Sequence, residues 1–159
     1  QEVKFNVLAR EKLQELLESE YGVKRDLSHY LAYFCEGRIG TALRLKGTDV
    51  LREKNLVLDY YIKDKKERDV SSKDKGVFRQ QLTILATWLR DIVFLKAGMP
   101  PAELIHFDRR EEIIRSARSS SLEALQEAFT AVSQAFLYLD QNINLGLVNA
   151  HIRMELSKL

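Results

Sequence analysis

The chain has 159 residues, of which 45% are hydrophobic and 30% are charged. This length and balance fit one domain with a sizeable apolar core, with or without a small appendage. The 25 basic and 23 acidic side chains leave a net charge of +2, too small to predict nucleic-acid binding by itself. A single cysteine, Cys35, excludes an internal disulfide and a cysteine-based metal site.

The start of the chain is Gln1 rather than methionine, and no signal-peptide pattern follows it. We therefore expect a fragment of a longer protein or a processed chain, of cytoplasmic origin. No apolar run approaches the roughly 18 residues that a membrane span needs, so no transmembrane helix is expected.

The first 47 residues predict three short helices. Val3–Glu20 carries leucines at helical spacing, and Gly22 is suited to the left-handed position that ends a helix. A second helix follows, and Gly37 separates it from a third. The segment Lys46-Gly47-Thr48 is the expected boundary between two domains.

Two longer helices are expected next. The first runs from Val50 to Ile62, and its charged tail, Lys63–Asp69, indicates a solvated helix end; a phosphate-binding arm is the alternative, weakened by three acidic residues. A polar loop leads to Gly76–Ala97, which is apolar on two faces and therefore predicts a central, buried helix. Gly98 and the prolines after it end this helix.

The remaining chain predicts a short helix and then a helical hairpin. Asp108 is expected to cap the helix Arg109–Arg118, and Ser119–Ser121 ends it and caps the next helix. Asn144 is expected to cap the last helix. The apolar seam of the first hairpin helix is predicted to consist of Leu122, Leu125, Phe129, Val132, Phe136, Leu139 and Ile143. No stretch shows sustained period-two alternation, so the predicted fold class is all-α.

Residues that could carry chemistry are scattered. The three histidines, His29, His106 and His151, lack partners at metal-ligand spacing and are expected to be surface or partly buried side chains. Cys35 sits among apolar residues, which favours an inert core thiol. Gly37–Gly40 lacks the lysine and hydroxyl residue of a phosphate-binding loop. We predict no catalytic residue, no cofactor-binding residue and no metal ligand.

Three segments together resemble one family. Residues 36–45 resemble the end of the lid domain of clamp-loader AAA+ subunits, where a Gly-Ser-x-x-x-Ala-Leu-like motif recurs. Residues 85–98 resemble the Trp-Leu-Arg-Asp helix of the C-terminal domain of bacterial DNA polymerase III delta-prime subunits. Residues 139–156 are similar to the closing Asn-x-Asn and leucine-rich helix of that family. The matching positions are Gly37, Ala42, Leu43, Trp88, Arg90, Asp91, Asn142 and Asn144.

The resemblance implies a three-helix lid over residues 1–47 and a helical-bundle collar domain over residues 48–159. Family members carry a nucleotide-binding module before the lid, and no such module is found in this chain. In ATP-binding subunits an arginine within the lid motif senses the nucleotide, whereas the aligned position here is Gly40. This departure favours the delta-prime type, which does not hydrolyse ATP, and implies a chain without enzymatic activity of its own.

Collar domains of this family assemble side by side into a ring around primer–template DNA. The resemblance therefore implies a role in DNA replication, with the other clamp-loader subunits (gamma/tau and delta) as partners and DNA contacted only through the assembled complex. Such an interface is built from helix faces with apolar, aromatic or arginine anchors. The candidate anchors are Phe129, Phe136, Tyr138, Leu147 and Met154.

Two other function classes are open from the residues alone. A free-standing helical module that binds a protein or a ligand predicts a closed apolar pocket. An enzyme predicts a polar cleft with convergent titratable groups, for which the sequence offers no constellation.

Overall fold

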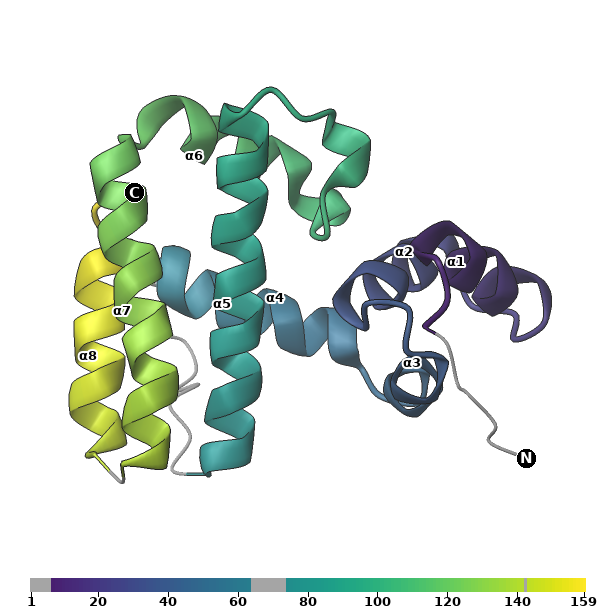
Figure 1. Ribbon diagram of the computed structural model, residues 1–159, viewed down its shortest axis with the longest axis horizontal. Helices are drawn as coiled ribbons and strands as arrows, with labels where there is room; N and C mark the ends of the chain where they lie inside the picture. The colour runs from purple at the N-terminus through teal and green to yellow at the C-terminus, as the bar shows by residue number, and fades with distance from the viewer. Residues whose placement is uncertain (1–6, 64–73, 142) are drawn as a thin grey trace.

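The computed structural model describes residues 7–63, 74–141 and 143–159 (Figure 1). Within these ranges every regular element is a helix, so the predicted all-α class is confirmed. The elements are α1 (Arg10–Ser19), α2 (Arg25–Phe34), α3 (Ile39–Lys46), α4 (Val50–Ile62), α5 (Lys75–Lys96), the 3₁₀ turns η1 (Pro101–Glu103) and η2 (Phe107–Arg109), α6 (Arg110–Ser119), α7 (Leu122–Asp140) and α8 (Leu145–Leu156). None of the described helices is both long enough and apolar enough to cross a membrane.

Helices α1, α2 and α3 form an N-terminal unit with a core of its own. Leu13, Leu17, Leu31 and Ala42 are fully buried within it. The first helix begins at Arg10, later than predicted, and Gly22 takes the left-handed conformation (φ 61°) expected after it. Cys35 is buried in the same core, as predicted, and burial raises the pKa of its thiol to about 11, which disfavours the reactive thiolate.

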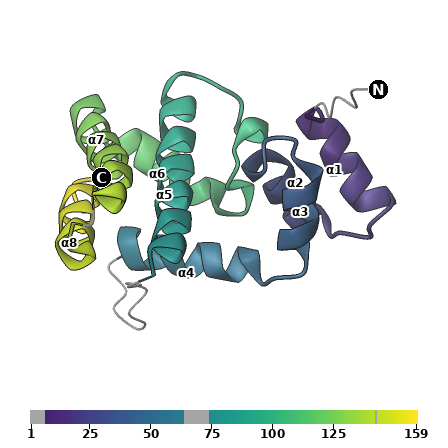
Figure 2. The ribbon, with the colours of Figure 1, turned by 60° about the horizontal axis from the view of Figure 1, so that its bottom comes forward.

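Helix α4 joins the N-terminal unit to the rest of the molecule. Its first residue, Val50, belongs to the N-terminal core, whereas Val57 and Leu58, two turns later, belong to the larger core. Figure 2 shows α4 running from the unit formed by α1, α2 and α3, past α5, toward the end of the molecule that α7 and α8 form. The two cores therefore meet along one continuous helix. The predicted charged tail after Ile62 lies, from residue 64 onward, outside the described residues.

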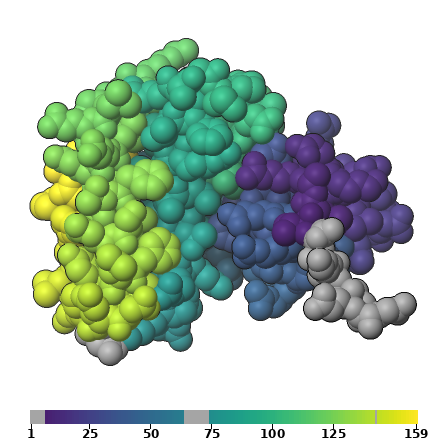
Figure 3. Space-filling view, viewed as in Figure 1, coloured from purple at the N-terminus to yellow at the C-terminus, as the bar shows by residue number. Residues whose placement is uncertain are grey.

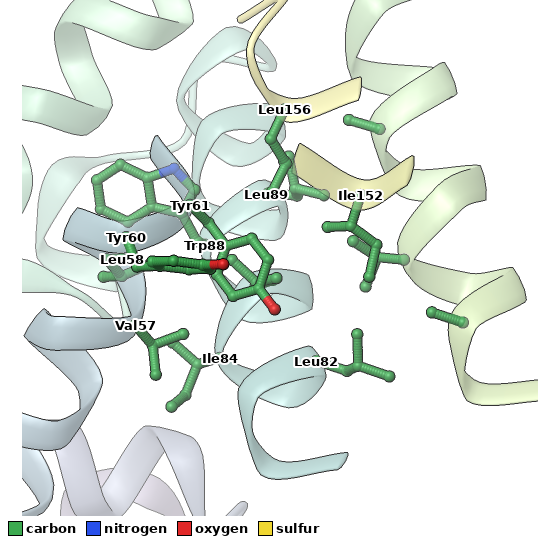
Figure 4. Close-up of a cluster of buried hydrophobic side chains, with 14 of the residues drawn as sticks. Val57, Leu58, Tyr60, Tyr61, Leu82, Ile84, Trp88, Leu89, Ile152 and Leu156 are labelled. Atoms are coloured by element: carbon green, nitrogen blue, oxygen red, sulfur yellow. The ribbon is translucent and has the colours of Figure 1, made fainter. Parts of the chain in front are cut away.

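Helix α5 is the central helix of the larger core, as its two apolar faces predicted. Phe78, Leu82, Leu85, Trp88 and Leu89 are at most 1% exposed, and the helix packs against α4, α6 and α7. Figure 4 shows side chains of α4, α5 and α8 meeting in this core. Gly98, which has a positive φ of 82°, follows the end of α5 as expected.

Helices α7 and α8 form the predicted hairpin, but the buried face of α7 differs from the predicted seam. Leu122, Phe129 and Ile143 are 69%, 37% and 37% exposed. The buried residues are Leu125, Ala128, Ala131, Val132, Ala135 and Leu139. Leu125, Val132 and Leu139 are therefore buried as predicted, and the three alanines beside them, which the seam did not include, let α7 approach α5 and α8 closely.

Candidate functional site

Asp91 holds the connector that leads from α5 to α6. The side chain is fully buried, and its carboxylate accepts hydrogen bonds from the backbone N–H groups of Ile105 (3.2 Å) and His106 (2.9 Å). Arg90 donates a third bond (2.7 Å). Burial raises the pKa of Asp91 above its ordinary value, although these donors oppose the shift. Asp91 thus fixes the backbone of the connector.

Arg90 and Trp88, which belong to the same Trp-Leu-Arg-Asp segment of α5, also contact the connector. Arg90 also donates to the carbonyl of Glu103 (3.1 Å), and its guanidinium lies 3.7 Å from the ring centre of Phe94. Trp88 is 1% exposed and meets the ring of His106 edge-on, with centres 5.7 Å apart. The segment that carries the family resemblance therefore holds the connector in place.

His106 is fully buried, which corrects the expectation of a surface or partly buried histidine. Its Nε2 atom lies 2.9 Å from the hydroxyl of Thr87. Burial keeps the pKa of His106 well below its ordinary value, so the ring is neutral at physiological pH. The two other histidines lie elsewhere, and no three His, Cys, Asp or Glu side chains of the described ranges gather as a metal site.

Asp108 pairs with Lys54 instead of capping the next helix as predicted. The Lys54 amine is fully buried and donates to both carboxylate oxygens of Asp108, the longer bond being 2.6 Å. The helix after Asp108 has no side-chain cap. A buried ammonium without a counter-charge is strongly destabilising, whereas a missing helix cap costs less. Asp108 therefore pairs with Lys54 and does not cap α6. Local spacing carries no signal of this pair, because its members are 54 positions apart.

Arg109 forms the centre of a second ionic cluster between α4 and α6. It donates to the carboxylates of Asp59 and Glu112 at 2.6 Å each, and Lys63 also bonds to Glu112 at 2.8 Å. Burial acts to raise the pKa of both carboxyls, but the bonds to Arg109 and Lys63 outweigh burial and hold both values below their ordinary range. The cluster ties α4 to α6.

The lid-like motif lies at the turn between α2 and α3. Gly37 is buried with a φ of 79°, and a Cβ atom there would lie 2.0 Å from the carbonyl oxygen of Leu8. Ala42 is fully buried and Leu43 is half-buried, so both are core residues. Gly40, at the position aligned with the nucleotide-sensing arginine, faces open space.

The closing Asn-x-Asn motif begins α8. The Asn144 side chain accepts a hydrogen bond from the backbone N–H of Gly146 (2.9 Å), which confirms the predicted cap. Asn142 lies outside the described residues. Ser121 likewise caps α7 by accepting from the N–H of Ala124 (3.0 Å), as expected.

The five candidate anchors divide into two groups. Phe129, Leu147 and Met154 are 37%, 69% and 56% exposed and remain available to a partner. Phe136 and Tyr138 are half-buried against the larger core, so intramolecular packing uses part of their surface. Leu137, which was not among the candidate anchors, is also 60% exposed. The hairpin that carries these residues forms the end of the molecule opposite α1 (Figure 3).

A groove between α7 and α8 lies on the same hairpin. Its cavity has a volume of about 470 Å³ and is lined by Glu123, Gln126, Glu127, Thr130, Ala131, Gln134, His151, Glu155 and Lys158. Lys158 donates to Glu127 (3.0 Å) and to Glu155 (2.6 Å) and so connects the two helices. Three carboxylates against one ammonium leave the groove acidic.

These observations define the class of the protein: an all-helical bundle in which the described buried ionic clusters tie elements together. Half of the large apolar side chains that are exposed in the described ranges lie on the terminal hairpin. Residues 69–155 match the family model "DNA polymerase III, delta subunit, C terminal". The match covers more than half of the 159 residues, so the chain belongs to this family. No curated protein and no solved structure matches the chain.

Proposed function

We propose that the chain is the non-catalytic lid and collar part of a delta-prime-like clamp-loader subunit that assembles the clamp-loader ring in DNA replication. The family membership supports a role with DNA polymerase III. The narrower choice of the delta-prime type rests on the Trp-Leu-Arg-Asp segment of α5 and on Gly40 at the position of the nucleotide-sensing arginine.

The observation that carries this proposal is the exposed apolar surface of the α7–α8 hairpin. Leu137, Leu147 and Met154 are each more than half exposed, and they lie within the region that matches the family. Exposed apolar clusters on a well-packed domain mark sites of protein association. The described ionic clusters, by contrast, are occupied with holding α4, α5, α6 and the connector together.

The proposed domain division places the lid in residues 1–47 and the collar in residues 48–159. Its support is the presence of two apolar cores, one in α1, α2 and α3 and one in the bundle. Helix α4 contributes to both cores, so the lid would be carried on the collar by a continuous helix.

The test is a pull-down with purified gamma/tau and delta subunits, using the full chain. We expect the chain to retain both subunits, and Met154→Ser to weaken retention because an exposed anchor is lost. Met99→Ser is the matched control, because Met99 is 42% exposed on the loop after α5, away from the hairpin. A chain that retained neither subunit would contradict the proposal.

The proposal places the chain in the cytoplasm and gives it DNA contact only through the assembled complex. The alternative, a free-standing module that binds a ligand, predicts a closed apolar pocket. The α7–α8 cavity does not favour this alternative, because all but one of its lining side chains are polar.

A further inference from the structure

The α7–α8 groove lies directly beside the exposed apolar side chains of the hairpin. Leu137 follows the groove residue Gln134 by three positions, Leu147 precedes His151 by four, and Met154 follows His151 by three. Side chains three or four positions apart on a helix are neighbours on its surface. An apolar patch and an acidic groove therefore form one continuous surface, called the hairpin surface below.

The hairpin surface carries a negative charge on a chain that is positive as a whole. Residues 121–159 contain four acidic and two basic side chains, whereas the whole chain has a net charge of +2. Asp140 is engaged with Arg79 (2.7 Å), and Arg153 is turned toward the Tyr60 hydroxyl (3.4 Å). The charges that remain on the groove are three glutamates and Lys158.

One basic side chain of the protein itself, Lys158, already lies in the groove. Lys158 lies between Glu127 and Glu155, with its amine 3.0 and 2.6 Å from their carboxylates. Glu123, one turn before Glu127 on the same lining, has no ion-pair partner among the described residues. An approaching surface would therefore meet an unpaired carboxylate beside apolar side chains.

We propose that the hairpin surface docks a helix of a neighbouring clamp-loader subunit that presents apolar side chains together with arginine or lysine. This inference rests on the proposed function and adds the charge of the partner surface. Complementary charge selects partners and accelerates their encounter. Phosphate backbones and anionic lipid surfaces are repelled by the same carboxylates, which disfavours nucleic acid and membrane as occupants.

The test compares the affinity of the full chain for the purified gamma/tau and delta subunits at about 0.05 M and about 0.5 M salt. The variants are Glu123→Lys and the milder Glu123→Gln. Glu20→Lys is the matched control, because it makes the same charge change at an exposed site after α1. Helical content is measured for each variant to show that the fold is kept.

We expect Glu123→Lys to weaken binding about tenfold at low salt, Glu123→Gln less, and the difference to shrink at high salt. Glu20→Lys should bind like the unchanged chain. Equal affinity of Glu123→Lys and Glu20→Lys, or tighter binding by Glu123→Lys, would overturn the proposal.

The two proposals fail in different ways. If the unchanged chain binds neither subunit, or associates only with itself, both are wrong. If Met154→Ser weakens binding but Glu123→Lys does not, the hairpin remains the assembly surface and the basic partner is refuted.

Discussion

Gly37 shows why a single residue type is required at the turn between α2 and α3. Its φ of 79° lies in the left-handed region, and the preceding Glu36 also has a positive φ of 50°. The segment that enters α1 passes over this turn, where the N–H of Leu8 donates to the carbonyl of Gly37 (3.1 Å). A side chain on residue 37 would occupy the place of the Leu8 backbone. Glycine at position 37 therefore permits both the left-handed turn and the close passage of the Leu8 backbone over it.

We expect Gly37→Ala to lower the free energy of unfolding by about 2–4 kcal/mol, from left-handed strain and loss of the Leu8 contact. Gly40→Ala is the matched control in α3. Nothing lies near its added Cβ atom, so it should be neutral or should stabilise by about 0.5–1 kcal/mol through helix propensity. Urea denaturation measures both. Equal effects of the two substitutions would show that the crossing at residue 37 is not as described.

The second prediction at this scale concerns Asp91. Asp91→Ala leaves two backbone N–H groups of the connector without their acceptor and removes the ion pair with Arg90, and should cost about 3–5 kcal/mol. Asp140→Ala removes an exposed ion pair with Arg79 and should cost less than about 1 kcal/mol. Thermal and urea unfolding of both variants check this. A small loss for Asp91→Ala would mean that water replaces the carboxylate.

At the scale of elements, α7 shows what helical spacing can and cannot predict. Spacing located the helix, its cap and its partner α8, because these depend on neighbouring residues. It placed Leu125, Val132 and Leu139 on the buried face correctly, but it missed the alanines beside them, because rows of large and small apolar residues fit the same period. Which row is buried depends on how closely α5 and α8 approach, and the alanines decide this.

Two leucines one turn apart on α7 test that assignment. Leu125 is 2% exposed, so Leu125→Ala should lower the free energy of unfolding by about 2–5 kcal/mol. Leu122 is 69% exposed, so Leu122→Ala should change it by less than about 0.5 kcal/mol. Chemical denaturation of the pair is the measurement. Large losses of similar size from both substitutions would restore the seam expected from spacing, because that seam contains both leucines.

The candidate site was predicted less completely than the helices. The exposed anchors Leu147 and Met154 were anticipated, since they fall outside the periodic core pattern of α8. The acidic groove and the buried Lys54–Asp108 pair were not, because each joins residues far apart in the sequence. Local spacing contains no information on which distant charges meet.

At the scale of the whole molecule, the N-terminal unit is attached at more than one place. Helix α4 enters both cores, and Ile105 of the connector packs into the N-terminal core while Asp91 of α5 holds its backbone. His29 of α2 lies 2.7 Å from the carbonyl of Leu104. The N-terminal unit is therefore joined to the larger bundle by α4, by the apolar side chain of Ile105 and by polar contacts.

The ionic cluster between α4 and α6 predicts loss of stability in acid. Asp59 and Glu112 have lowered pKa values in the folded protein, so their stabilising effect is present above their ordinary values of 3.8 and 4.5. It is lost as the pH falls through the lower, folded-state values. The raised pKa of Asp91 acts in the opposite direction and offsets part of the loss.

We expect urea denaturation to give a decreasing free energy of unfolding below about pH 4.5. Glu112→Gln should reduce this dependence by removing one titrating group of the cluster. Glu123→Gln, which lies outside the cluster, should leave the dependence unchanged. A Glu112→Gln variant with the same acid sensitivity as the original chain would assign the effect to other carboxyls.

Trp88 is the single tryptophan of the sequence, and it lies where the connector meets α5. Arg109 stands over its indole at 5.8 Å, and the surrounding side chains exclude solvent. The tryptophan fluorescence of the chain therefore comes from one place, the contact between α5 and the connector. The wavelength of this emission reports on that contact without any added label.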